Sequence, residues 1–279
     1  MNGVFRHLAI GLFVGQFTFT PVSFAVESST EDADRKKMIA QARAEDLGEV
    51  LAELKLSADF LAAQQSLYFE AALGYDVVQV TGQKLEFGGS RKIAMRRPDR
   101  VRAHAESREG SEATLFFDGR SISIELADEN AYVSVEKPGS LDAAFDYLAE
   151  DLGVPTPLAD LLSANFYADI ADRIAAGFVV GESKVGNTDC VHVAFSTDDI
   201  DVQMWIENSD RPLPHRLVIT YRRAEGSPQF WAQLENWDLK PKTPDSLFAY
   251  TPPEGAERIP FAAAVARAVE DARAEKEGN

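Results

Sequence analysis

The residues best suited to catalysis or metal binding are few in this sequence. Of four histidines, His104, His192 and His215 follow residue 25, and the chain has a single cysteine, Cys190. Cys190 and His192 are two positions apart on a predicted strand, so their side chains point to the same face. Two ligands are half of a zinc site, and we predict a buried structural cysteine beside a hydrogen-bonded histidine. His215 lies in the rigid turn 211–216, which predicts a surface position.

Carboxylates are abundant, but none stands out as an acid–base pair. The chain has 45 Asp and Glu residues. Asp198, Asp199 and Asp201 lie at a predicted hairpin, where solvated acidic residues are common. The sequence contains no HExxH, GxSxG, P-loop or GxGxxG motif. We therefore predict no catalytic residue, no metal site and no cofactor.

One basic segment interrupts this acidic chain. Residues 91–102 hold a single acid, Asp99, among six basic residues, which are Arg91, Lys92, Arg96, Arg97, Arg100 and Arg102. Two interpretations stay open: a site for a lipid headgroup or an acidic partner, and a set of strand residues paired with surplus carboxylates. The formal charge of the whole chain, −17, argues against nucleic acid as a partner and against adsorption to anionic membranes by charge alone.

The first 25 residues have the pattern of a secretory signal peptide. Arg6 and His7 precede an apolar run over residues 8–19 that is too short and interrupted to span a bilayer, and residues 23–25 read Ser-Phe-Ala. We predict export to the periplasm with cleavage after Ala25, and we exclude residues 1–25 from the fold. No later segment approaches about 18 uninterrupted apolar residues, so we predict no transmembrane segment.

Helical and strand patterns alternate along the rest of the chain. Apolar residues recur every three or four positions over residues 33–63, which predicts an amphipathic helix with Gly48 and Leu56-Ser57 as candidate break points. The same period returns in a helical insertion at 141–174, and residues 261–279 form a charged helical tail. Strand patterns occupy eleven segments: 66–80, 82–95, 100–107, 113–117, 121–126, 131–136, 178–184, 189–196, 201–207, 216–223 and 229–239.

Consecutive hairpins, such as the one at Asp118-Gly119, predict an antiparallel meander and not a βαβ fold. Residues 121–126 are apolar on one face, whereas Leu115, Phe116 and Phe117 are apolar on both, so part of the sheet is covered. We predict an α+β fold with one domain over residues 26–260. A curved antiparallel half-barrel of about 11 strands would have helices packed in or over its concave face, and the three tryptophans would lie in the core.

Six short motifs follow one another along residues 35–260 and together resemble an uncharacterised family of predicted periplasmic proteins. They lie at residues 82–87, 96–102, 117–123, 190–195, 205–206 and 212–219. That family is similar in turn to the LolA/LolB superfamily of bacterial outer-membrane lipoprotein carriers. The shared elements are the RRPDR stretch, the FDGRSISI hairpin and the closing FAYTPPEG stretch (Phe248–Gly255). The resemblance implies an open, strongly curved antiparallel half-barrel that helices close over an apolar cavity.

The same resemblance implies a role for one arginine. In the carriers, an arginine in a Lys-Arg-Pro-Asn stretch tethers the helical lid, and the matching residue here is Arg97, in Arg96-Arg97-Pro98-Asp99. A guanidinium suits this task because its rigid fork of donors can hold several carbonyl groups. This chain departs from the carriers in its greater length, its extended insertion and its charged tail.

The first functional hypothesis is a non-enzymatic periplasmic binding protein with an apolar cavity for a lipid, an acyl chain or a lipidated partner. The expected cavity and lid residues are Leu115, Phe117, Phe145, Leu148, Leu161, Leu162 and Phe166. The alternative is a protein-interaction or envelope-stress sensing module, with a periplasmic protein as partner and a half-barrel filled by its own helices. A third alternative, a hydrolase that uses scattered carboxylates, has no recognisable catalytic constellation.

Overall fold

The computed structural model describes residues 30–152 and 158–260. The predicted signal peptide at 1–25, the predicted charged tail at 261–279 and residues 153–157 of the helical insertion lie outside the described residues.

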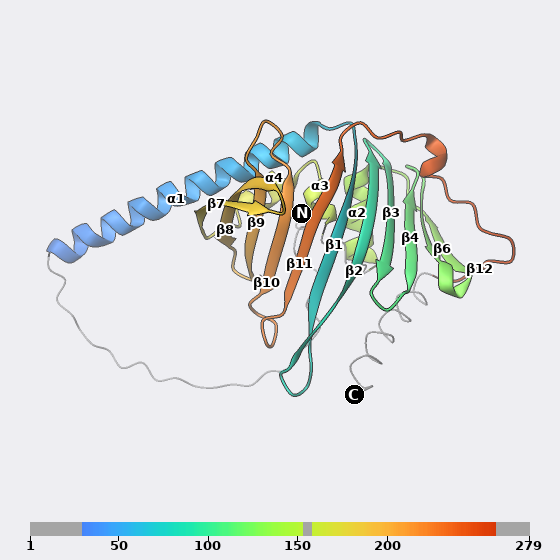
Figure 1. The fold of residues 1–279 in the computed structure, drawn as a ribbon, viewed down its shortest axis with the longest axis horizontal. Helices are drawn as coiled ribbons and strands as arrows, with labels where there is room; N and C mark the ends of the chain where they lie inside the picture. The colour runs from blue at the N-terminus through green and yellow to red at the C-terminus, as the bar shows by residue number, and fades with distance from the viewer. Residues whose placement is uncertain (1–29, 153–157, 261–279) are drawn as a thin grey trace.

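Twelve strands form one curved sheet, in the order β12-β6-β5-β4-β3-β2-β1-β11-β10-β9-β8-β7 (Figure 1). The first antiparallel meander consists of β1 (Ser66–Val78), β2 (Lys84–Arg96), β3 (Arg100–Ser107), β4 (Glu112–Phe117), β5 (Ser121–Leu126) and β6 (Ala131–Glu136). The second consists of β7 (Ala176–Val185), β8 (Thr188–Ser196), β9 (Ile200–Glu207), β10 (Pro214–Tyr221) and β11 (Gln229–Asp238). The predicted α+β class with a curved antiparallel sheet is confirmed.

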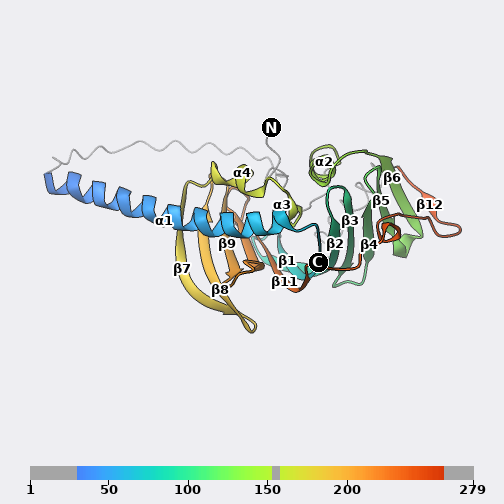
Figure 2. The ribbon, with the colours of Figure 1, turned by 90° about the horizontal axis from the view of Figure 1, so that it is seen from above.

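The two meanders meet where β1 pairs with β11. β1 runs antiparallel to β2 on one side and to β11 on the other, so that Leu73 lies opposite both Gly89 and Ala232. The first strand of the first meander and the last strand of the second meander therefore join the two meanders into one sheet. The helices lie on one face of this sheet, here called the inner face, and the opposite face is the outer face (Figure 2).

The expected number of about 11 strands was one too few. The twelfth, β12 (Glu257–Arg258), pairs in parallel with β6, and the next residue, Ile259, is buried against Ala131 and Val133. Two residues are too short for an alternating pattern, so the sequence contains no local indication of this strand.

Helix α1 (Thr30–Ala63) is continuous over 34 residues, without a break at Gly48 or at Leu56-Ser57. Its buried side chains include Val50, Leu54, Ala58 and Leu61, at the spacing of one helix face. This face packs on β7 and β8, where Val50 lies against Gly177. Gly48 does not interrupt the helix. It lies on the exposed side, with open space around it.

The predicted helical insertion forms several short helices, and we call α2 to α4 the lid. They are α2 (Leu141–Asp146) with the π turn η2 (Tyr147–Asp151), α3 (Ala159–Leu162) and α4 (Phe166–Ala171). The hydroxyl of Ser140 caps α2 by accepting a hydrogen bond from the amide of Ala143. The lid lies over the inner face beside α1 (Figure 2). Two 3-10 turns, η1 (Ala127–Glu129) and η3 (Asp245–Leu247), complete the described helices.

One apolar core fills the space between the inner face and the helices. It takes buried side chains from both meanders, among them Phe69, Met95, Phe117, Met204 and Leu217, together with α1 and the lid. Because strand side chains alternate between faces, the central strands contribute every second residue to this core, as β9 does with Ile200, Val202, Met204 and Ile206.

The prediction of three core tryptophans was right for Trp237 and wrong for the other two. Trp237 stacks on the buried Phe69 with ring centroids 4.4 Å apart. Trp205 and Trp231 are half-buried on the outer face, with the guanidinium of Arg216 5.7 and 5.6 Å from their ring centroids. Strand alternation decides this, because the flanking residues of each tryptophan point inward.

The indole of Trp231 depends on a glycine in the neighbouring strand. A Cβ atom at Gly74 would lie 2.6 Å from Nε1 of Trp231, well inside van der Waals contact. We expect Gly74→Ala to lower the free energy of unfolding by about 1–3 kcal/mol, because the indole must shift. The matched variant Gly48→Ala should raise it by about 0.5–1 kcal/mol, because alanine favours a helix and meets no atom there. Urea denaturation followed by circular dichroism measures both, and equal effects would contradict this packing.

Candidate functional site

The lid places apolar side chains directly against the inner face. Of the seven expected cavity and lid residues, five are buried in the core cluster: Phe117, Leu148, Leu161, Leu162 and Phe166. Leu115 and Phe145 are half-buried and pack against the same cluster. The residues expected to line an open cavity are therefore in contact within a filled interior.

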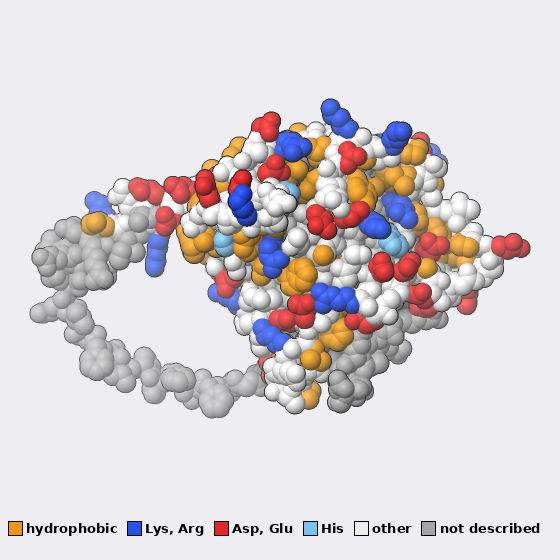
Figure 3. Space-filling view, in the orientation of Figure 1, with side chains coloured by type: hydrophobic (Ala, Val, Ile, Leu, Met, Phe, Trp, Pro, Cys, Tyr) orange, Lys and Arg blue, Asp and Glu red, His pale blue; other side chains and the backbone are white. Residues whose placement is uncertain are grey.

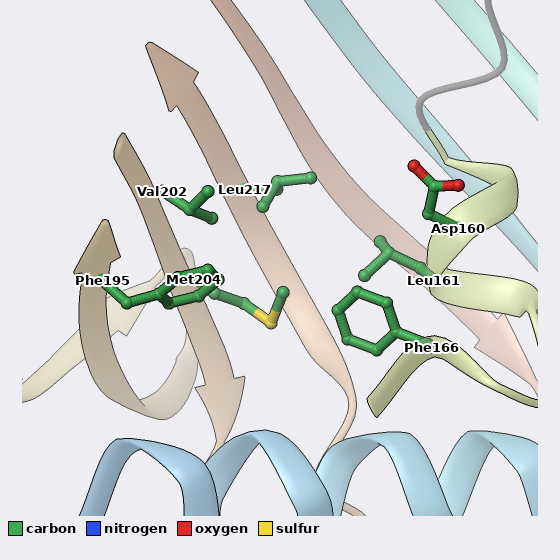
Figure 4. Close-up of a pocket in the computed structure, with 7 residues that line it drawn as sticks. All are labelled: Asp160, Leu161, Phe166, Phe195, Val202, Met204 and Leu217. Atoms are coloured by element: carbon green, nitrogen blue, oxygen red, sulfur yellow. The ribbon is translucent and has the colours of Figure 1, made fainter. Parts of the chain in front are cut away.

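A small residual cavity of about 10 Å³ remains beneath the lid (Figure 4). Asp160, Leu161 and Phe166 line it from the lid, and the sheet contributes Phe195, Val202, Met204 and Leu217. This volume holds one water molecule at most, whereas pockets for small molecules measure roughly 300–1,000 Å³. With the lid in this position, this cavity has no room for an acyl chain.

The four sheet residues of this cavity were missed from the sequence. Strands β8, β9 and β10 of the second meander supply them, whereas the two sheet residues named from the sequence, Leu115 and Phe117, belong to β4 of the first. Alternation along β9 identifies Val202 and Met204 as inward-facing. It does not say which part of the inner face the lid covers, because that depends on the curvature of the whole sheet.

Asp160 is a carboxylic acid at the wall of this otherwise apolar cavity. Its pKa is raised to about 8, chiefly by burial and also by the nearby carboxylates Asp169 and Asp146, while the positive charge of Arg173 partly opposes them. Burial and the charge of Asp160 also raise the pKa of Tyr221 to about 12. A carboxyl group with a pKa near 8 is mostly protonated at neutral pH and can then donate a hydrogen bond.

Arg97, in the turn between β2 and β3, contacts the lid. Its Nη2 donates a hydrogen bond to the backbone carbonyl of Leu162, at 2.8 Å, just where α3 ends. Burial lowers the pKa of Arg97, and the negative charge of Asp142 partly restores it. The same turn also holds the start of α2, because the carbonyl of Pro98 accepts a hydrogen bond from the amide of Leu141 at 2.9 Å.

Arg96, the preceding residue, points to the outer face. Its guanidinium forms an ion pair with Asp245, donates to the carbonyl of Thr243 and lies 5.5 Å from the ring centroid of Phe248, which is fully buried. Two adjacent arginines, the last residue of β2 and the first of the turn, thus hold the C-terminal stretch and the lid on opposite faces.

The C-terminal stretch Phe248–Gly255 packs on the first meander. The ring centroid of Tyr250 lies 5.2 Å from that of Phe116 and 5.5 Å from that of Tyr132. Asn130 donates a side-chain hydrogen bond to the carbonyl of Gly255. Of the three elements that suggested the carrier resemblance, FAYTPPEG thus contacts RRPDR through Arg96 and Phe248, and it packs on Phe116, the residue before FDGRSISI.

The basic segment does not form a single surface patch. Arg96 and Arg100 form ion pairs with Asp245 and Asp99, as the interpretation of strand residues paired with surplus carboxylates expects. Arg91 is on the inward-facing side of the strand register, opposite to Lys92 and Arg96, and Arg97 reaches the lid from the turn after β2. Acidic and basic side chains are interspersed over the face shown in Figure 3.

The candidate metal residues are structural, as predicted for Cys190. Cys190 is buried, its thiol lies 3.6 Å from the carbonyl of Thr188, and burial raises its pKa. His192 stacks on Trp205 at 4.0 Å and shares a hydrogen bond with Gln203, and burial lowers its pKa. Over residues 30–152 and 158–260, no group of three or more His, Cys, Asp or Glu side chains is placed to hold a metal ion.

The remaining histidines and acids take part in local contacts. His104 is 3.0 Å from the hydroxyl of Thr114. The surface position predicted for His215 was wrong, because β10 begins at Pro214 and places His215 half-buried, 3.1 Å from Glu207. The hairpin acids are held by cations, since Asp199 pairs with Arg223 and Asp201 with Arg222.

A model of the family described as "Predicted periplasmic protein (DUF2092)" matches residues 52–262. The chain belongs to this family. The match spans both meanders, the lid and the C-terminal stretch, and confirms the family resemblance that the ordered motifs indicated. No curated protein matches the chain in sequence.

Several solved structures are similar to this DUF2092 protein. The Mycobacterium tuberculosis lipoprotein LppX is 14% identical, with a TM-score of 0.45 over 70% of this chain and 98% of LppX. The LolA superfamily protein NE2245 from Nitrosomonas europaea is 11% identical, with a TM-score of 0.34 over 71% of this chain and 96% of that one. MucB in complex with MucA(peri) is 18% identical, with a TM-score of 0.38 over 74% of this chain and 60% of MucB.

The raised pKa of Asp160 makes the free energy of unfolding depend on pH, and the direction of this dependence follows from the sign of the shift. The folded protein binds this proton more tightly than the unfolded chain, in which the pKa is near the ordinary 3.8. The stabilisation that comes from this bound proton is complete below about pH 3.8 and is lost as the pH rises through about 8. We expect Asp160→Asn to flatten the fall in unfolding free energy between about pH 5 and pH 9 and to stabilise the protein at the upper end.

Urea denaturation across this pH range measures the effect. The matched control is Asp198→Asn, because Asp198 is exposed in the turn between β8 and β9. Parallel stability profiles for wild type, Asp160→Asn and Asp198→Asn would show that Asp160 does not titrate under the lid.

Proposed function

We propose that this protein is a periplasmic binding protein without catalytic chemistry, and that an apolar group binds its inner face when the lid moves aside. The ligand would be a lipid, an acyl chain or the lipid of a modified protein partner. The observation that carries the proposal is that the lid covers an apolar surface of the sheet with Leu161, Leu162 and Phe166, in the place that a ligand would take.

The construction of the lid supports a movable element. Helices α3 and α4 have four and six residues, too few to be stable without their contacts to the sheet. Lid movement would expose the inward-facing side chains of β8 to β10, which are Phe195, Val202, Met204 and Leu217. A ligand that covers the same apolar area would replace the lid contacts at little net cost.

The proposed location agrees with the family, which is described as predicted periplasmic. Export would use the signal peptide at residues 1–25, with cleavage after Ala25. Within residues 30–152 and 158–260, none of the helices has the length and apolar character needed to cross a membrane.

A second candidate function rests on the filled interior. A cavity of about 10 Å³ is what a protein-interaction or envelope-stress sensing module with a solid core would have. In that case the partner would bind the outside of the molecule, and the lid would be a permanent part of the core.

Native mass spectrometry with lipid extraction separates the two candidates. We expect protein isolated from its periplasm to carry a lipid or fatty acid in stoichiometric amount. A mass without ligand, together with no uptake of an environment-sensitive apolar dye, would overturn the binding function and favour the module with a solid core.

Arg97→Lys tests the proposed lid tether while keeping the positive charge. A lost hydrogen bond to a charged donor costs about 1.5–3 kcal/mol, so amides of α3 and α4 should exchange with deuterium about tenfold faster or more. Uptake of the apolar dye should rise in parallel. The control is Arg96→Lys, in the adjacent position but on the outer face, which should leave lid exchange unchanged. Equal exchange in the two variants would refute the tether.

A further inference from the structure

Strand β7 ends the sheet with an open edge. Its ten residues pair with β8 on one side, and β7 has no second neighbour in the strand order. Among the described residues, no backbone hydrogen bond outside the β7–β8 pairing involves residues 176–185. At the other end of the sheet, the short parallel strand β12 covers β6. An exposed strand of this length presents unpaired N–H and C=O groups that another strand can pair with.

The same strand exposes large apolar side chains. Phe178 is 53% and Val180 49% exposed, and Val180 lies at a bulge in the β7–β8 pairing, between Val179 and Gly181. Hydrophobic side chains reach the surface at this end of the sheet (Figure 3). Charged residues that protect natural edges are confined to the far part of the strand, at Glu182 and Lys184.

Helix α1 continues past this edge. Its described contacts with the core start at Leu47 and Val50, where the helix packs on β7 and β8, and its N-terminal part extends beyond β7 (Figures 1 and 2). In that part, Met38 is 72% exposed. The helix is also polar along its length, with the exposed cations Lys37 and Arg43 before the exposed acids Glu45 and Glu49.

We propose that a second copy of this chain binds here, with the two β7 strands pairing antiparallel about a two-fold axis and the two α1 helices lying antiparallel beside them. A two-fold axis that relates two identical edges requires antiparallel pairing, and such closed dimers are the commonest assemblies. Antiparallel helices place the basic stretch at Lys37 and Arg43 of one copy near the acidic stretch at Glu45 and Glu49 of the other.

The two elements together offer more contact surface than the strand edge alone. Specific interfaces bury about 1,200–2,000 Å² in total, which ten paired strand residues alone do not reach. The projecting half of α1 supplies further contact surface on the same side of the molecule (Figure 1). The dimer leaves the lid and the β2–β3 turn free, so it is independent of the proposed ligand.

Sedimentation velocity of the exported protein over micromolar concentrations tests the dimer. We expect the wild type to dimerise, and Phe178→Lys or Val180→Lys to raise the dimer dissociation constant about tenfold or more, because an edge lysine opposes strand pairing. The combined variant Lys37→Glu and Arg43→Glu should also weaken the dimer, most strongly at low salt, where charges are least screened.

Val80→Lys is the matched control. Val80 is fully exposed in the turn between β1 and β2, far from the β7 edge in the sheet order, and the same substitution there should leave the dimer unchanged. Circular dichroism confirms that each variant is folded. A monomeric wild type, or a dimer that Phe178→Lys and Val180→Lys leave as stable as Val80→Lys does, would overturn the proposal.

Discussion

Pairing between β1 and β11 makes the two meanders into one sheet, and the rest of the structure depends on this pairing. It places the strands before the lid and the strands after it on one continuous inner face. That face is too large and too apolar to be left in water, and the chain covers it with α1 and with the lid. The lid is inserted between the meanders, so its two ends are anchored in β6 and β7, at opposite parts of the sheet.

The turn between β2 and β3 makes contacts on both faces of this sheet. Arg97 and Pro98 hold the lid from within, and Arg96 holds the C-terminal stretch from outside. Neighbouring residues thus contact the lid and Phe248 from opposite faces. One residue of the lid works against its burial, because an apolar environment disfavours the charged form of the Asp160 carboxyl. Apolar contacts therefore stabilise the lid, and the buried acid destabilises it.

Much of the fold followed from local pattern. The predicted bounds of β3, β5 and β6 agree with the structure, and the turn at Asp118-Gly119 holds a glycine with φ of 82°, a conformation that glycine adopts readily. Alternation and turn residues act over a few positions, so they are visible in the sequence. The family and the mainly antiparallel sheet could be predicted for the same reason, together with the buried Cys190.

The sequence by itself determined the elements, their order, and which side chains of each strand share a face. The tertiary structure alone decided which faces meet. It placed the lid over Phe195, Val202, Met204 and Leu217, filled the interior, turned Trp205 and Trp231 outward, and added β12 to the sheet edge. It also put Asp160 in an apolar wall. These outcomes depend on contacts between residues far apart in the chain and on the curvature of twelve strands together. The local periodicity of apolar residues contains no information about either.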